Sequence, residues 1–130
     1  MTKDTQNIAP NNHDLEAMKL AVVDAIEDIK GFDISVMDVR KLTSMTNYMI
    51  VASANSSRQA KAIADNVREK LKEKGFAIRG TEGEKEGEWV LVDLDDIVVH
   101  IMVPATRAYY NLEQLWGEAE NRRSHIKAEE

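Results

Sequence analysis

The sequence has no cysteine, two prolines, six glycines and only 5% aromatic residues among its 130 positions. Without cysteine, the chain offers no disulfide framework, no thiolate ligand for zinc and no cysteine nucleophile. It also has no run of eighteen apolar residues, so no membrane-spanning helix is expected. The N-terminal stretch is polar and lacks the apolar segment of a signal peptide. We therefore expect a cytoplasmic protein.

The three histidines are isolated from one another. No HxH, HxxxH or HExxH spacing occurs, and two of the three, His13 and His125, fall in presumed tails. A catalytic zinc site needs at least three protein ligands. We therefore expect neither a bound metal nor a cofactor.

Negative charge is concentrated in one stretch. The chain has a formal net charge of −6, and residues 82–96 alone hold seven carboxylates against one lysine, Lys85. A broad nucleic-acid surface needs net positive charge to displace counterions from phosphate, so the composition argues against one. The acidic stretch suits a basic partner instead.

The hydrophobic pattern indicates a single α/β domain of the α+β-like kind. Helical spacing of apolar residues predicts helices over 14–30, 57–74 and 107–126. Short apolar or alternating runs predict strands over 32–39, 47–54, 88–94 and 97–103, with a short edge strand over 76–80. The order α-β-β-α-(β)-β-β-α favours a mixed β-sheet with helices packed on it.

The last two strands are predicted to form a hairpin whose two-residue turn is Asp95-Asp96. This register places six apolar side chains on one face of the sheet: Val90, Val92, Leu94, Ile97, Val99 and Ile101. The other face carries Trp89, Asp93 and His100. Asp93 is then a diagonal neighbour of His100, within hydrogen-bond reach.

Two candidate catalytic arrangements involve Asp93. With His100 it could form a general-base pair or half of a metal site, although a structural hydrogen bond that fixes the hairpin is the favoured interpretation. Asp93 and Asp95 form an Asp-x-Asp that could hold magnesium for nucleotidyl transfer. The segment SANSSRQ before the second helix has no glycine to form a phosphate cradle. Ser56 in that segment is better explained as a helix cap, with Gln59 completing a capping box.

The aromatic residues allow two interpretations. An indole rimmed by carboxylates, as Trp89 is, is typical of an interface anchor. Packing beneath the last helix is an equally weighted alternative. Tyr109, Tyr110 and Trp116 could stack on nucleic-acid bases, but only scattered cations lie near them, so packing of the last helix in the core is favoured.

Three stretches carry a family resemblance: TNYMIVASANSSRQAKAIADNV (46–67), EGEKEGEWVLVDLDDIVVHIM (82–102) and RAYYNLEQLW (107–116). Together they closely resemble the ribosomal silencing factor family, also called Iojap-related proteins. The match runs in order from Leu15 to Trp116, and the combination of W-V-L-V-D-L, V-V-H and Y-x-L-E-x-L-W is specific. The resemblance implies a domain over 13–117, between a flexible tail (1–12) and a charged tail (118–130).

The resemblance also implies a function. Such proteins bind the large ribosomal subunit at its universal ribosomal protein number fourteen and sterically block association with the small subunit. They thereby repress translation in starvation or stationary phase, and they are not enzymes. Their fold is similar to a degenerate nucleotidyltransferase sheet. The family usually has Gly in the hairpin turn, where this chain has Asp95, a residue type that tolerates positive φ.

We therefore predict that the hairpin and its acidic rim dock on a basic ribosomal protein, with Trp89 as the anchor. The predicted contact residues are Glu82, Glu84, Glu88, Trp89, Asp93, Asp95, His100 and Arg107. Further expectations are a secondary contact with ribosomal RNA through Arg58, Lys61, Arg68 and Lys72, and a homodimer off the ribosome. The alternative function is a metal-dependent nucleotidyltransferase that uses Asp93 and Asp95.

Overall fold

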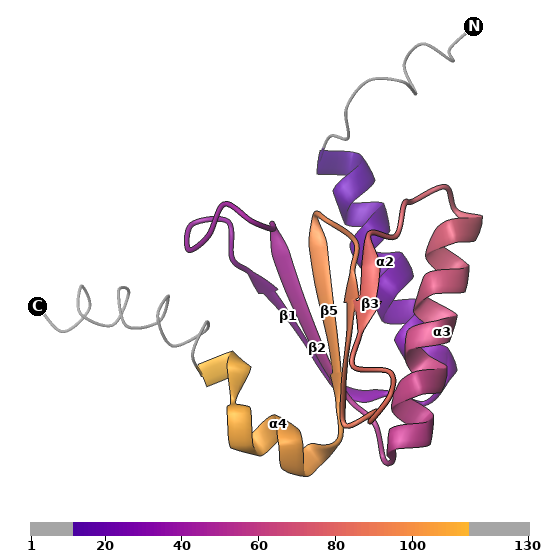
Figure 1. Ribbon diagram of the computed structural model, residues 1–130. Coiled ribbons are helices and arrows are strands. Elements are labelled where there is room, and N and C mark those ends of the chain that lie inside the picture. Colours follow the sequence, from indigo (N-terminus) through magenta and orange to yellow (C-terminus); the bar gives the residue numbers. More distant parts are fainter. Residues whose placement is uncertain (1–11, 115–130) are drawn as a thin grey trace, which may run out of the picture.

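The structure is a computed structural model that describes residues 12–114 (Figure 1). Its elements are α2 (Asn12–Asp28), β1 (Phe32–Asp38), β2 (Tyr48–Ser53), α3 (Ser57–Glu73), β3 (Gly80–Glu82), β4 (Trp89–Asp93), β5 (Ile97–Met102) and α4 (Pro104–Tyr110). The five strands form one sheet in the order β1-β2-β5-β4-β3. β2 and β5 are parallel and the other pairs are antiparallel. The predicted mixed α/β architecture is confirmed.

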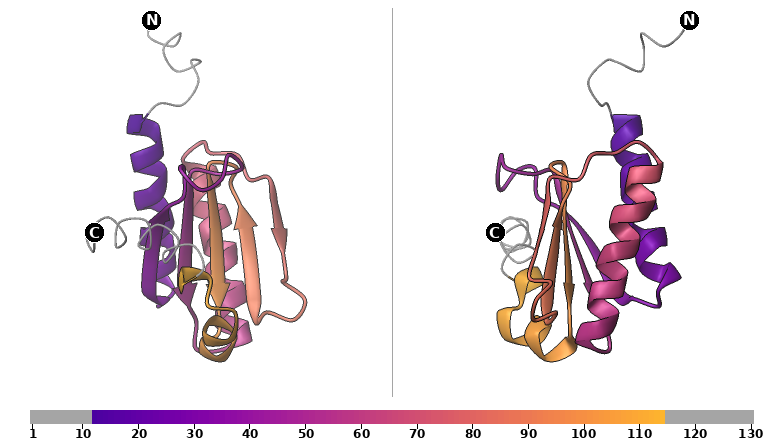
Figure 2. Two further views of the ribbon diagram at one scale, coloured as in Figure 1. Left: turned by 90° about the vertical axis from the view of Figure 1, so that its left-hand side faces the viewer. Right: turned by 45° about the vertical axis from the view of Figure 1, so that its right-hand side comes forward.

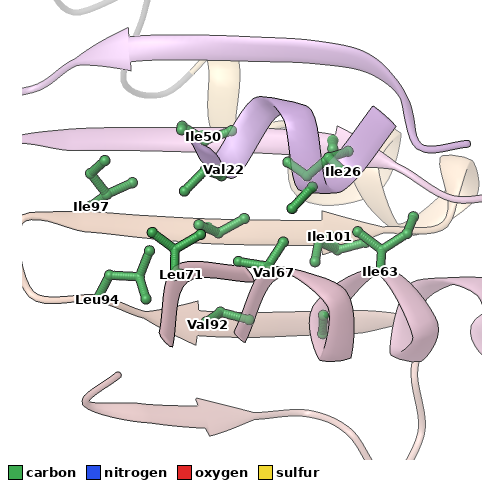
Figure 3. Close-up of a cluster of buried hydrophobic side chains, with 14 of the residues drawn as sticks. Val22, Ile26, Ile50, Ile63, Val67, Leu71, Val92, Leu94, Ile97 and Ile101 are labelled. Carbon is green, nitrogen blue, oxygen red and sulfur yellow. The ribbon is translucent and has the colours of Figure 1, made fainter. Parts of the chain in front are cut away.

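The helices cover the two faces of the sheet unequally. α2 and α3 lie side by side on one face, and α4 lies against one end of the other face (Figures 1 and 2). The five side chains of α3 at helical spacing are all fully buried: Ala60, Ile63, Ala64, Val67 and Leu71. With Val22 and Ile26 of α2 they pack on the sheet and form the main core (Figure 3).

The predicted hairpin register is confirmed. Trp89 is opposite Met102, Leu91 is opposite His100, and the six apolar side chains of the other face are buried in the main core. Asp95 makes the turn at φ 75°, where the family usually has Gly. The N–H of Asp96 donates to the carbonyl of Leu94 across this residue, at 2.9 Å.

Ser56 caps α3 as predicted. Its hydroxyl accepts a hydrogen bond from the N–H of Gln59 at 3.1 Å. The Gln59 amide oxygen accepts from the N–H of Asn55 rather than from that of Ser56 itself, and its nitrogen donates to the carbonyls of Ile29 and Lys30. One glutamine therefore joins the start of α3 to the end of α2.

The short edge strand is displaced from its predicted position. It was predicted over 76–80, but β3 begins only at Gly80. The N–H groups of Gly75 and Phe76 donate to Lys72 and Leu71 at the end of α3, with Gly75 at φ 91°, which is a left-handed helix termination. The chain must then cross from the helix layer to the sheet, so residues 76–79 precede the strand.

The last helix also differs from its prediction. α4 begins at Pro104, three residues earlier than expected, because proline is favoured in the first turn of a helix. It ends at Asn111, which is left-handed (φ 47°, ψ 57°) and whose side-chain oxygen accepts a hydrogen bond from Gln114 N–H. A continuous helix from Arg107 is therefore wrong at Asn111. Leu115 and Trp116, predicted to be in it, lie outside the described residues.

Candidate docking surface

The face of the sheet opposite α2 and α3 carries a second, smaller apolar cluster. Its buried members are Val39, Met49, Val51 and Met102, and Met37, Trp89 and Leu112 pack against it. Trp89 comes from the first position of β4, and Leu112 from the segment after α4. This cluster therefore joins the sheet to the C-terminal part of the described chain.

Three aromatic rings run outward from this cluster, and we call Trp89, Tyr109 and Tyr110 the aromatic patch. The ring centroids of Trp89 and Tyr110 are 4.7 Å apart, and those of Tyr110 and Tyr109 are 4.9 Å apart. Trp89 is half-buried, Tyr110 is 52% exposed and Tyr109 is 81% exposed. The interpretation that Trp89 packs against the last helix is confirmed. The expectation that the two tyrosines are core residues is wrong, because the helix turns them toward solvent.

His100 is paired with Trp89 and not with Asp93. The Trp89 indole N–H donates to Nδ1 of His100 at 2.9 Å. The Asp93 carboxylate instead accepts a hydrogen bond from the backbone N–H of Asp95 at 2.8 Å. The predicted structural Asp93–His100 bond is therefore wrong. Trp89 and Asp93 are both diagonal neighbours of His100. The indole is long enough to reach His100, whereas the Asp93 carboxylate is bonded to the backbone of the hairpin turn.

The environment of His100 fixes its protonation. Its side chain is only 5% exposed, and burial lowers its pKa to about 4. Because Nδ1 accepts a hydrogen bond from the Trp89 indole N–H, the neutral ring carries its own proton on Nε2. Nε2 is buried and has no hydrogen-bond partner among the described residues, so its N–H is left unsatisfied at a cost in stability.

Stability should therefore fall in mild acid. An unfolded histidine takes up a proton below pH ~6.5, whereas folded His100 takes one up only near its own lower pKa. The free energy of unfolding is therefore highest above the pKa of the unfolded histidine. It falls as the pH drops from there toward the pKa of folded His100, because only the unfolded state takes up the proton. Between pH 7 and pH 5 we expect a loss of about 2 kcal/mol in the free energy of unfolding.

Urea denaturation of the wild-type chain and of His100→Gln at both pH values measures this effect. Glutamine keeps an acceptor for the indole N–H but does not titrate in this range. The variant should lose less stability than the wild type by about the same 2 kcal/mol. Equal losses in the two proteins would show that His100 is not the group responsible.

Arg107 is an internal anchor of α4. Its guanidinium forms a two-bond pair with the Glu113 carboxylate, at 2.9 and 2.8 Å, and donates to the hydroxyl of Ser53 at 2.7 Å. Ser35 donates to the same carboxylate. These hydrogen bonds, led by that of Arg107, hold the pKa of the Glu113 carboxyl below its usual range. Since Ser35 and Ser53 belong to β1 and β2, this network fastens α4 and its two tyrosines to the sheet.

The acidic residues do not form one surface, because β4 separates them. Glu82, Glu84 and Glu88 lie in or beside the loop before β4, whose N-terminal end is next to α4, while Asp95 and Asp96 lie at the opposite end (Figure 1). The four residue steps along β4 amount to about 13 Å. Glu84 pairs with Arg68 at 2.8 Å, and Asp95 pairs with Arg79 at 2.7 Å. The sequence therefore overestimated the local charge density.

Two glycines shape the loop between β3 and β4, which we call the acidic loop (83–88). Gly83 has φ 84° and Gly87 has φ 78°. A Cβ on Gly83 would lie 2.0 Å from the carbonyl oxygen of Trp89. A Cβ on Gly87 would lie 2.9 Å from side-chain atoms of Ser57 and Lys61. The Val103 N–H donates to the Glu88 carbonyl at 3.1 Å, so the loop is held beside the start of α4.

The geometry does not support the alternative of a metal-dependent nucleotidyltransferase that uses Asp93 and Asp95. Within residues 12–114, no group of three or more His, Cys, Asp or Glu side chains could hold a metal ion. The carboxylates of Asp93 and Asp95 are engaged with the turn backbone and with Arg79.

No helix in the described part of the chain is long and apolar enough to cross a membrane.

The basic face proposed for RNA is also partly occupied. Arg68 forms ion pairs with Asp65 and Glu84 and donates to the Thr81 hydroxyl. Arg58 and Lys72 are exposed, and Lys61 is half-buried beside the acidic loop. The four cations therefore do not form an unpaired stripe.

Comparison with known proteins assigns the chain to a family. A family model described as "Ribosomal silencing factor during starvation" matches residues 12–130. The chain belongs to the ribosomal silencing factor family. Ribosomal silencing factor RsfS of Chromobacterium violaceum is 57% identical over 102 residues, covering 78% of this chain and 83% of that protein. The chloroplastic protein Iojap of Zea mays is 39% identical over 108 residues, covering 82% of this chain and 47% of that protein.

A protein of known crystal structure shares the fold. A crystal structure of a C. violaceum protein superimposes with a TM-score of 0.77 at 53% identity, covering 78% of this chain and 85% of that one. The names of the curated silencing-factor relatives describe a regulator and not a reaction.

The exposed tyrosines of α4 are the part of the candidate surface that the sequence did not predict. Pro104 was the sequence signal for the earlier start of this helix.

Proposed function

We propose that this chain binds the large ribosomal subunit through universal ribosomal protein number fourteen and blocks association with the small subunit. It thereby represses translation in the cytoplasm during starvation or stationary phase. Membership of the ribosomal silencing factor family supports this proposal. The observation that carries it is the aromatic patch. In this patch Tyr109 is 81% exposed and meets Tyr110 edge-on, and Tyr110 in turn contacts Trp89 of the sheet.

The aromatic patch has the features of an interface centre. Large exposed aromatic side chains rimmed by polar groups carry much of the binding energy in protein interfaces. The acidic loop lies beside the start of α4 and supplies Glu84 and Glu88, with Glu82 immediately before it, as partners for a basic protein. We propose that these carboxylates mainly accelerate association, because rim charges act chiefly on the on-rate.

Three of the remaining predicted contact residues, Trp89, His100 and Arg107, take structural roles in this proposal. Trp89 remains the anchor at the base of the patch, His100 fixes the indole, and Arg107 fixes α4. Asp93 is half-buried on the same face of the sheet as Trp89, but at the other end of β4, where its carboxylate accepts from the N–H of Asp95. Asp95 lies at the other end of β4 and is not part of the proposed surface.

The test is cosedimentation of the full chain with purified large subunits, followed by addition of small subunits. We expect the protein to pellet with the large subunit and to reduce the yield of joined ribosomes in proportion to its occupancy. Large subunits that lack protein number fourteen provide the matched control and should not retain the chain. Binding without loss of joining would refute steric blocking, and unchanged binding to the depleted subunits would refute the partner.

A further inference from the structure

A pocket of about 310 Å³ lies at the end of the molecule opposite α4. Three segments line it: the first turns of α2, the linker between α3 and β3, and the β4–β5 turn. Figure 1 shows these segments at the same end of the molecule. We call it the end pocket. Its apolar wall consists of Leu15, Met18, Phe76 and Leu94. It shares no residue with the aromatic patch and does not depend on the proposed function.

The apolar wall is built into the fold. Met18 and Leu94 are buried members of the main core, and Leu15 and Phe76 pack against that core. The linker is fixed at both ends, since Phe76 N–H donates to Leu71 and Arg79 N–H donates to Asp93 at 2.8 Å. The pocket is therefore formed without a ligand, which lowers the cost of binding one.

The rim of the end pocket carries excess negative charge. Three carboxylates, from Asp14, Asp95 and Asp96, surround it together with one cation, Arg79. The Arg79–Asp95 pair is highly exposed, and exposed pairs of this kind contribute at most about 1 kcal/mol, so the pair can exchange partners. The Asp96 carboxylate accepts from the neutral amide of Asn47 at 3.2 Å, and no Lys or Arg within residues 12–114 forms an ion pair with it.

We infer that the end pocket binds a protein segment that presents an apolar side chain next to lysine or arginine. The apolar side chain would enter the cavity against Leu15, Phe76 and Leu94, and the cation would meet Asp95 and Asp96. Charge complementarity selects this occupant. Nucleic-acid phosphates would be repelled by the rim, and a second copy of this chain carries the same net negative charge.

The probe is a synthetic peptide, acetyl-Gly-Lys-Leu-Lys-Gly-amide, titrated into the isotopically labelled full chain and followed by NMR. We expect amide signals of residues 75–79, 95 and 96 to shift, with a dissociation constant on the order of 1 mM for so short a ligand. Raising the salt concentration should weaken binding, because salt screens the attraction between the peptide lysines and the exposed rim carboxylates. A peptide with glutamate in place of both lysines should bind at least tenfold more weakly.

Two variants locate the site. Ala77→Trp places a large side chain at an exposed position of the rim and should weaken binding at least tenfold by filling the cavity. Asp95→Asn removes one charge, keeps a residue type that tolerates positive φ, and should weaken binding about threefold. Glu86→Gln, in the acidic loop at the other end, should bind the peptide like the wild type.

Three results would overturn the inference. Equal binding of the lysine and glutamate peptides would show that the rim does not select charge. Wild-type affinity in Ala77→Trp would show that the peptide binds elsewhere. Shifts of the same amide signals on simple dilution of the protein, without peptide, would identify a second copy as the occupant.

Discussion

Tyr109→Ala should weaken binding to the large ribosomal subunit by about 2 kcal/mol, or roughly thirtyfold, without unfolding the protein. Tyr109 is 81% exposed, so its loss removes little from the core. In the proposed complex its ring would be buried, and removal of a buried aromatic ring is among the most costly interface truncations. Cosedimentation over a range of protein concentrations measures the change, and a thermal melt verifies the fold.

Met45→Ala is the matched control. Met45 is 83% exposed and lies in the loop between β1 and β2, at the end of the molecule away from α4 (Figure 1). Both substitutions remove a large, exposed apolar side chain, and only Tyr109 belongs to the aromatic patch. If the two variants bind equally well, or if Met45→Ala alone loses affinity, the docking surface has been placed on the wrong side of the protein.

Gly83→Ala should destabilise the fold by roughly 3 kcal/mol. The new Cβ would lie 2.0 Å from the carbonyl oxygen of Trp89, and the residue would also have to adopt φ 84°. The obstacle is backbone, which cannot rotate away as a side chain can. We expect the start of β4 to move, with loss of the β3–β4 pairing and displacement of Trp89. Chemical denaturation gives the free energy of unfolding.

Gly75→Ala separates the two contributions to this effect. Gly75 also has positive φ, at 91°, but nothing lies within 4 Å of its added Cβ. It should cost only about 1 kcal/mol, the strain of the left-handed conformation alone. Similar losses in the two variants would mean that the acidic loop can relax around the clash, and that it does not hold Trp89 in place.

Patterns that depend on burial were predictable from the sequence. The face of α3 and the hairpin register both follow from apolar residues repeated at 3.6 or 2 positions, and a slip of one residue would bury His100 in the main core. The positive φ of Asp95 agrees with the family resemblance, in which Gly usually occupies this position of the turn.

Choices between neighbouring polar partners were not predictable. Asp93 and Trp89 are both diagonal to His100, and only the side-chain conformations decide which of them bonds to it. The break at Asn111 depends on a single left-handed residue within an otherwise helical pattern. The pairing of Arg107 with Glu113, Ser35 and Ser53 was not predicted either, because it depends on how α4 packs on the sheet. Arg107 was therefore predicted from the sequence only as a contact residue.

The separation of the acidic residues could have been foreseen. A predicted strand between two charge groups places them at its opposite ends, about 3.3 Å per residue apart, however dense the charge is along the chain. Counting charge within a sequence window ignores that extension. Glu84 and Asp95 therefore belong to different surfaces, as their separate pairing with Arg68 and Arg79 confirms.

The parallel pairing of β2 with β5 has a consequence for how the protein forms. β5 is the central strand, yet it pairs with β2 across 49 positions of sequence, as Tyr48 with Ile97. Such distant contacts slow folding, because the entropy of closing a long loop is lost before the contacts can form and stabilise the chain. During synthesis, the first half of the domain emerges with one edge of β2 unpaired. A nascent chain of this protein should therefore acquire its stable fold only after β5 has left the ribosome's exit tunnel.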